Sequence, residues 1–405
     1  GEQRSLTILE DKEELTQTLP FVISHKGDTV IHLDELFQNY QRKADHRRLT
    51  VEYTANPLWY AVKALPFVLE PEERDALSLA AAYYASVWSA VCAERYPQIR
   101  TWADSWRNQT DRISGNVFDV EKQKELMAGL SRSLKRLQKT DGSFGWFRGM
   151  TGSLHITLSV AKQLFRAAKV GREGNVRLVS FVDVKAMMEY LIREMRQDLH
   201  QEKRYMESNG RSLYGSAHWA DYLYVATLAG LGNFGDEAKK ELHEMVGLLM
   251  RDKARLSLYE RAEAAVVLRR MGRDDEAAQL VRSIREHLVD GEEGLHIEYP
   301  SNGFVGSDRK MAVHTMLMEA LALAGGADKA ETDGLCRWLL SQKRLQDWGT
   351  STATMDAVYA LLQGQGQDLT LQTGDEVRLE SPKGEEWAVL QTSRDGLSGL
   401  GTVSA

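Results

Sequence analysis

Residues 72–96, EERDALSLAAAYYASVWSAVCAERY, decide the fold class of this 405-residue chain. Aliphatic side chains, aromatic rings and seven alanines spread over nearly the whole stretch, which contains neither proline nor glycine. A helix with one apolar stripe packs against a core on one side, whereas a helix that is apolar all round is buried on every side. The stretch therefore predicts a fully buried helix inside a large helical domain.

The helix predicted next has a different pattern. Leu126, Leu130 and Leu134 share one face, while Lys135 and Arg136 lie on the other, which is typical of a helix between core and water. The same alternation continues along the chain. All-round apolar helices are predicted at residues 155–170, 217–231, 256–268 and 311–324, and amphipathic helices between them at 184–199, 238–249, 277–288 and 330–340.

Hairpins that join a buried helix to an amphipathic one pack as two concentric layers. Closing the inner layer into a ring buries it without leaving exposed ends. We therefore predict a mainly α fold, an α/α toroid of helical hairpins over residues 54–365. The alternative, an open superhelix of the tetratricopeptide type, requires amphipathic helices throughout and a tighter repeat, so the sequence favours it less.

Short strands are predicted on both sides of the toroid. The candidates are residues 21–24, 29–33 and 48–53 before it, and 369–371, 376–379 and 387–391 after it. Because short β segments seldom stand alone, we expect the two flanks to pair with each other. Residues 1–53 and 366–405 would then be two parts of one β domain, into which the toroid is inserted.

The composition argues against several classes of protein. With 51 basic and 58 acidic residues the net charge is −7, so nucleic acid is not an expected partner. The sequence has no run of 18 apolar residues and no signal-peptide pattern at its start. Because it ends within strand-rich sequence, we expect it to be an excerpt of a longer protein, with any signal or anchor elsewhere.

Two segments predict similar corners between helices, one from Gln138 to Trp146 and one from Gln342 to Trp348. In each we expect the glutamine amide to bind free backbone groups and the indole to close the corner. Similar corners occur in terpene cyclases, which are also toroids. Those enzymes need an Asp-X-Asp-Asp acid or an Asp-rich helix that binds magnesium, and the sequence has neither.

The remaining candidates for chemistry have structural interpretations. Cys92 and Cys336 lie in apolar stretches and are predicted to be buried thiols. His155, His218 and His314 lie near the starts of apolar helices, and we expect them to point inward as satisfied core or pocket residues. Cys336 with His314 is the only conceivable beginning of a zinc site, so the sequence predicts no metal and no cofactor.

A specific resemblance begins at residues 50–66, TVEYTANPLWYAVKALP, which include Tyr53, Asn56, Pro57, Trp59 and Tyr60. The segment closely resembles the entry to the thioester domain of bacterial α2-macroglobulins. The motifs WLLSQK, WGTSTAT and AVYALL at residues 338–362 are similar to the last hairpin of that domain. The resemblance implies an α/α toroid inserted into a discontinuous β domain of CUB type.

The resemblance also implies a function for the full-length protein. Members of the family are secreted or bound to the cell envelope, and they trap proteases after cleavage of a bait segment, which this sequence does not contain. The implied partners are proteases and other domains of the same chain. The implied location is the periplasm or the extracellular side of the envelope, and a membrane anchor on the full-length protein stays open.

One departure from the family changes the expected chemistry. Thioester members carry Cys-X-Glu-Gln shortly before the aromatic pair that corresponds to Tyr83 and Tyr84. Counting back from this pair places the cysteine position at Asp75 and the glutamine position at Ser78. An internal thioester needs a thiolate and a glutamine amide, which these residues do not supply. We therefore expect a protease trap without covalent capture and without enzymatic activity.

Two alternative functions remain open at this stage. One is an enzyme of the terpene-cyclase or glycan-active type, which needs carboxylates that converge in the centre of the toroid. The other is a scaffold or adhesion module of the cell envelope, which has the same sequence features as the trap.

Overall fold

The computed structural model describes residues 27–34, 58–71, 73–96, 117–210, 218–230, 234–298, 307–343, 347–363, 376–381 and 383–391, with isolated positions between these ranges. Contacts divide the chain into two compact units, Gly1–Arg47 and Arg48–Ala405. The described helices and both described sheets belong to the second unit. The strands predicted at residues 21–24 and 369–371, and most of the one at 48–53, lie outside the described residues.

Two sets of helices alternate along the second unit. The inner set consists of α3 (Ala76–Arg95), α6 (Leu154–Glu173), α8 (Trp219–Ala229), α10 (Leu258–Arg270), α12 (Ser307–Ala320) and α14 (Ser351–Gln363). The outer set consists of α2 (Leu58–Leu69), α5 (Val120–Leu137), α7 (Val184–Asn209), α9 (Asp236–Arg251), α11 (Asp274–Arg285) and α13 (Lys329–Ser341). The predicted alternation and the mainly α fold class are confirmed.

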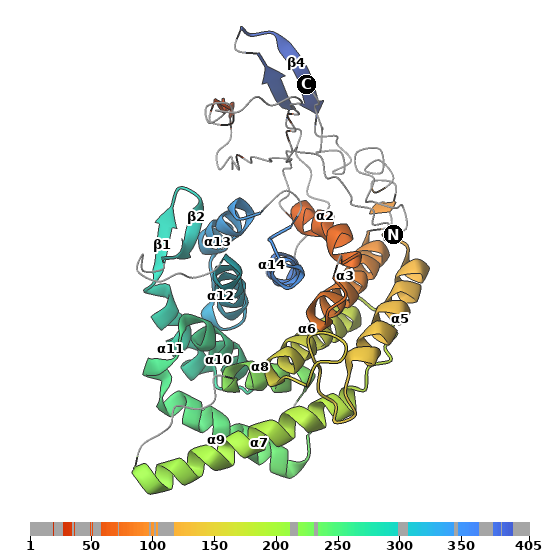
Figure 1. Cartoon of the computed structure of the whole chain (residues 1–405). Helices are drawn as coiled ribbons and strands as arrows, with labels where there is room; N and C mark the ends of the chain where they lie inside the picture. The colour runs from red at the N-terminus through yellow and green to blue at the C-terminus, as the bar shows by residue number, and fades with distance from the viewer. Residues whose placement is uncertain are drawn as a thin grey trace, which may run out of the picture. The chain divides into compact units, whose positions relative to one another are not determined.

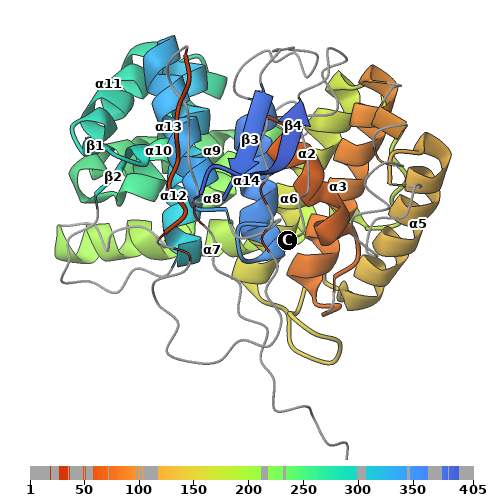
Figure 2. The ribbon, with the colours of Figure 1, turned by 90° about the horizontal axis from the view of Figure 1, so that it is seen from above.

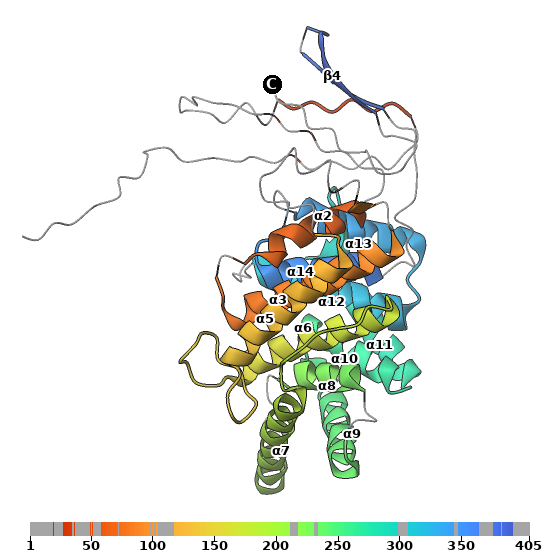
Figure 3. The ribbon, with the colours of Figure 1, turned by 90° about the vertical axis from the view of Figure 1, so that its right-hand side faces the viewer.

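The inner helices close a ring. Helix α3 packs on α6, and the contacts continue through α8, α10 and α12 to α14, which returns to α3. The outer helices cover this ring, with α5 on α3, α11 on α10 and α13 on α12. Figure 1 shows the inner helices within the outer ones, Figure 2 shows α5 on the outer side of α3, and Figure 3 shows α7 beside α9.

The two layers follow from the distribution of apolar side chains. In α10, residues 262–268 are all buried, whereas in α11 the buried residues are Ala277, Leu280, Val281 and Ile284, at the spacing of one helix face. Among the described helices, α3 is long and apolar enough to cross a membrane, but most of it is buried among its neighbours. Its composition is therefore explained by its place in the inner layer.

A hairpin that the sequence analysis missed follows α11. Strand β1 (Leu288–Gly291) pairs antiparallel with β2 (Gly294–Ile297), and β2 packs against α13. The turn itself consists of Glu292 and Glu293, which lack the usual asparagine or glycine signal of a two-residue hairpin turn. Short 3₁₀ and π segments, η2 (Lys253–Arg255) and η3 (Leu321–Gly325), complete the helical part.

The predicted strands have mixed outcomes. Strands β3 (Glu376–Glu380) and β4 (Glu386–Gln391) form an antiparallel pair, which confirms the last two candidates. The strand predicted at residues 29–33 is wrong, because these residues form no ladder and Val30 is 79% exposed. A β-prone segment becomes a strand only where a partner covers its backbone and side chains. The expected pairing of β3 or β4 with the first flank stays a prediction.

Candidate functional site

A network of buried charged groups lies where the inner helices converge. The Arg166 side chain of α6 is only 2% exposed. Its Nη1 donates to Asp356 Oδ1 at 2.5 Å, its Nη2 to Glu319 Oε2 at 2.8 Å, and its Nε to the Tyr224 hydroxyl at 2.8 Å. Because these partners belong to α14, α12 and α8, one guanidinium group joins four inner helices.

Glu319 is the principal acceptor of the network. The Tyr224 hydroxyl lies 2.8 and 3.0 Å from its two oxygens, Arg270 Nη2 donates to Oε1 at 2.9 Å, and the Tyr359 hydroxyl lies at 3.4 Å. Arg166 also lies 4.3 Å from the centre of the Tyr359 ring, and Arg270 lies 4.5 Å from that of Tyr224. Hydrogen bonds and cation–π contacts therefore satisfy this buried carboxylate and both cations.

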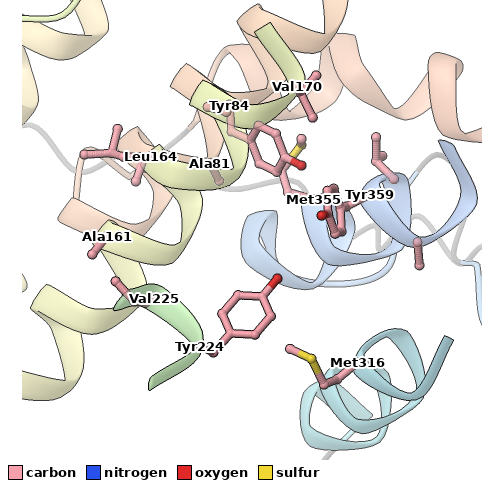
Figure 4. Close-up of a cluster of buried hydrophobic side chains, with 14 of the residues drawn as sticks. Ala81, Tyr84, Ala161, Leu164, Val170, Tyr224, Val225, Met316, Met355 and Tyr359 are labelled. Carbon is pink, nitrogen blue, oxygen red and sulfur yellow. The ribbon is translucent and has the colours of Figure 1, made fainter. Parts of the chain in front are cut away.

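Two tyrosines of the network, Tyr224 and Tyr359, belong to a cluster of buried aromatic, aliphatic and sulfur-containing side chains (Figure 4). Tyr84 of α3, Tyr224 of α8 and Tyr359 of α14 approach one another there, with Met316 and Met355 beside them, and all five are buried. The Tyr84 and Tyr359 rings are 6.4 Å apart and tilted by 54°. The centre of the ring is therefore packed by residues from several inner helices.

The pKa shifts follow from burial and from the charged neighbours. Burial by itself would raise the pKa of Glu319, but Arg166 and Arg270 together outweigh it and lower the pKa. Burial raises the pKa of the Tyr224 hydroxyl, although Arg166 opposes the shift. At neutral pH Glu319 is therefore ionised between the guanidinium groups of Arg166 and Arg270, and the Tyr224 hydroxyl that binds it is neutral.

A second polar cluster adjoins this network. Lys162 Nζ lies 3.8 Å from Asp356 Oδ1 and donates to the Tyr259 hydroxyl at 3.1 Å. Glu263 of α10 is completely buried, and the charges of Asp221 and Lys162 act on its carboxyl group. Lys162 thus connects the ionic network to Glu263 and its neighbours.

The geometry of the network favours a structural role. Arg166 crosslinks carboxylates from different helices, and Glu319 already accepts from both Arg166 and Arg270. A carboxylate held in this way is not free to take up and release protons during a reaction. Within the described ranges, no group of three or more His, Cys, Asp or Glu residues is placed to hold a metal ion.

The sequence analysis did not identify this network, although it contained a signal. Arg166, Glu263 and Glu319 interrupt helices that are otherwise apolar on most faces. A charge in such a helix predicts a buried partner of opposite charge. The partner stayed undetermined because 153 residues separate Arg166 from Glu319, and 190 separate it from Asp356.

The two positions matched to the thioester lie together at the start of α3. Asp75 is buried, and its Oδ1 accepts hydrogen bonds from the backbone N–H groups of Leu77 at 2.8 Å and Ser78 at 3.1 Å. The Ser78 hydroxyl donates to Asp75 Oδ2 at 2.5 Å. These contacts make Asp75 the N-cap of the helix, a role that carboxylates fill well.

The first predicted corner is right for Gln138 and wrong for Trp146. The Gln138 side-chain amide donates to the Asp183 carbonyl oxygen at 2.8 Å and accepts from the Asp183 N–H at 3.0 Å. The Trp146 indole, however, is 47% exposed and stacks on Phe147, whereas Phe144 is buried. Because the backbone of Phe144 forms antiparallel bridges on both sides, its ring takes the inner position and closes the corner.

The second corner has the opposite outcome. Trp348 is buried, and its indole N–H donates to the Leu339 carbonyl oxygen at 2.6 Å, as expected. The Gln342 amide instead donates to the Glu293 carboxylate at 3.1 Å, so the expected contact with free backbone groups is wrong. The β1–β2 hairpin, which the sequence analysis missed, brings Glu293 to this position.

The family-entry residues are only partly described. Trp59 is buried in α2, and the Lys343 ammonium group lies 5.0 Å from the centre of the Tyr60 ring. This contact joins the first and last parts of the helical domain. Tyr53, Asn56 and Pro57 lie outside the described residues.

The histidines differ from one another. His314 is buried, its Nε2 lies 3.0 Å from the Leu335 carbonyl oxygen, and burial lowers its pKa to about 4. The interpretation of His314 as a core residue is therefore confirmed, but it is only half satisfied, because its buried Nδ1 has no hydrogen-bond partner among the described residues. His155 is exposed at the start of α6, so its predicted inward orientation is wrong, and its ring lies 6.0 Å from that of the half-buried His218.

Both cysteines are buried thiols outside any disulfide, as predicted. Burial raises the pKa of Cys92 and of Cys336 to about 12, from a reference value of 9.0. We expect alkylation of the folded chain to be at least about a thousandfold slower than that of an exposed thiol, and rapid after unfolding. Iodoacetamide labelling followed by mass spectrometry measures this ratio, and fast labelling of either residue in the folded chain would contradict it.

Comparisons with known proteins add no relative. A scan against protein-family models finds no match, and a search of curated proteins finds none. The function is therefore inferred from the residues of this chain and their geometry.

Proposed function

We propose that this chain is a module of an α2-macroglobulin-like protease trap that acts without a covalent thioester. The proposal is supported by the entry motif at residues 50–66, the motifs of the last hairpin and the closed ring of inner helices. In the full-length protein, the module would contribute to conformational trapping of a protease or to contacts between domains.

The observation that carries the proposal is the hydrogen bond between Asp75 and Ser78. A thioester forms when a thiolate attacks the amide carbon of glutamine and ammonia leaves. At the matched positions a carboxylate and a hydroxyl group instead lie at the cap of α3, and the thiols of Cys92 and Cys336 are buried elsewhere. The geometry therefore supports a helix cap in place of a reactive bond.

The two alternative functions have less support. A toroid enzyme requires converging carboxylates, and Glu319 and Asp356 do converge, but both bind Arg166. Buried tyrosine and methionine side chains lie between the inner helices, where such an enzyme would need an open cavity for its substrate. A scaffold or adhesion module predicts the same ring as the trap and differs only in its response to proteases.

The test uses the full-length protein that carries this sequence. After incubation with a protease, we expect a shift in native gel mobility, together with protection of large but not small substrates of that protease. Labelled methylamine should not be incorporated at residues 75–78. If neither the mobility shift nor the protection is observed, the scaffold or adhesion module is favoured over the trap. Incorporation of methylamine at these residues would disprove the absence of a thioester.

A further inference from the structure

The strongest unexplained feature is the side chain of Glu263. It has no exposed surface, and in the described part of the chain no donor meets either carboxyl oxygen with the distance and angle of a hydrogen bond, although the Asp221 and Tyr259 side chains lie near enough to influence its pKa as hydrogen-bonding groups. An ionised carboxylate in such a place loses its hydration without compensation, which is one of the most unfavourable arrangements in a folded protein. A neutral carboxylic acid avoids most of this cost.

The charges of the surrounding network point to the same state. Among the described residues of the two clusters, three cations are matched by three carboxylates: Lys162, Arg166 and Arg270 by Asp221, Asp356 and Glu319. An ionised Glu263 would add a fourth negative charge. The buried clusters are therefore electrically balanced only when Glu263 holds a proton.

The groups that face Glu263 come from several inner helices. Asp221 of α8 and Lys162 of α6 act on its charge in opposite senses, and Tyr259 lies one helical turn before it on α10. From α14, Asp356 shares Lys162. These groups leave no unmatched cation for Glu263.

The neighbouring α12 and α11 have charges of their own. Glu319 of α12 is neutralised by Arg166 and Arg270. At α11, the N-cap residue Arg273 binds Glu276, and Arg285 binds Glu331 of α13. Arg273 and Arg285 are therefore matched to carboxylates other than Glu263.

From this geometry we propose that Glu263 is a buried proton-binding site, and that its proton stabilises the packing of α10 with α6 and α8 in the inner ring. Burial and the nearby Asp221 raise the pKa of Glu263, while Lys162 opposes the shift. Loss of the proton adds the fourth, unmatched negative charge beside Asp221. The ring is then expected to loosen at α8 and α10, where this charge lies.

The sign of the pH dependence follows. Because the folded-state pKa lies above that of the unfolded chain, the contribution of Glu263 to stability is complete below about pH 4.3. It decreases as the pH rises through the interval up to the folded-state pKa. The contribution of Glu263 to the free energy of unfolding is therefore largest in an acidic environment and smaller in a neutral or alkaline one. This inference does not depend on the proposed protease-trap function.

The variant Glu263→Gln tests the proposal, because glutamine has nearly the same shape and cannot ionise. Urea unfolding of the variant and the wild type is compared from pH 5 to pH 8. We divide the folding equilibrium constant of the variant by that of the wild type. As the pH increases toward the folded-state pKa, this ratio should rise by about tenfold for each pH unit. A ratio that stays constant over this range would overturn the proposal.

The matched control is Glu276→Gln on α11. The hydrogen bonds and charge of Arg273 lower the pKa of Glu276, so its titration falls below this pH range and its ratio should stay flat. An infrared spectrum gives a readout independent of stability. Folded wild type at pH 7 should show the carbonyl band of a protonated carboxylic acid, which Glu263→Gln removes. Absence of this band from the wild type would overturn the proposal even if the variant fails to fold.

Discussion

Replacing Glu319 by glutamine is expected to lower the free energy of unfolding by about 3–5 kcal/mol, as observed when one partner of a buried ion pair is removed. The change leaves the guanidinium groups of Arg166 and Arg270 without the carboxylate that both bind. Because these cations are buried on α6 and α10, the loss should affect the closure of the whole ring. Urea unfolding monitored by tryptophan fluorescence measures the effect.

The control for this experiment is an acidic residue on the outer layer. Glu237 of α9 is 79% exposed and lies 3.4 Å from Arg196, so Glu237→Gln should change stability by less than about 1 kcal/mol. Adding Arg270→Gln to Glu319→Gln removes one charge of each sign and should recover part of the loss. A cost of less than about 1 kcal/mol for Glu319→Gln would show that the network does not hold the ring together.

A comparably large effect is expected for Gly142→Ala in the corner between α5 and α6. Gly142 has a φ of +92°, and an added Cβ would lie 2.0 Å from the backbone oxygen of Ala186 in α7. Positive φ strains an alanine by about 1–2 kcal/mol, and overpacking adds about 1–3 kcal/mol. We expect a total loss of about 2–5 kcal/mol, measured by thermal or urea unfolding.

Gly149 in the same loop separates the two contributions to this loss. Its φ is also +92°, but an added Cβ would meet no atom within 4 Å. Gly149→Ala should therefore cost only the backbone strain, about 1–2 kcal/mol. Equal losses for the two variants would show that the contact of the loop with α7 contributes nothing. A larger loss for Gly142→Ala would show that this contact, beside the Gln138–Asp183 hydrogen bonds, stabilises the corner.

The sequence predicted the helical layers well because the relevant information is local. Each inner helix has apolar residues on most faces and the outer helices from α5 to α13 each have one apolar stripe, so periodicity separates these layers; α2, which is buried on most faces, is the exception. The short strands at 376–380 and 386–391 were also found, since a Ser-Pro-Lys-Gly turn separates them. The β1–β2 hairpin was missed because the helical pattern of α11 was extended to residue 288.

The side chains in the corners were predicted less well. Phe144 and Trp146 are both aromatic and lie two residues apart in a loop, so composition does not decide which of them is buried. The antiparallel bridges of Phe144 decide it, and they depend on backbone positions before and after the loop. His155 is a similar case, because its place at the start of α6 leaves it at the exposed edge of the ring.

The sequence by itself determined the alternation of buried and half-buried helices, the closed ring that this alternation implies, and the absence of a thiol and an amide at positions 75 and 78. Only the tertiary structure decided that Asp75 and Ser78 bind each other, and that Arg166, Glu319 and Asp356 meet in the centre. Helix patterns depend on neighbours a few residues apart, whereas the partners of a buried charge are chosen by ring closure, which brings together residues up to 190 positions apart.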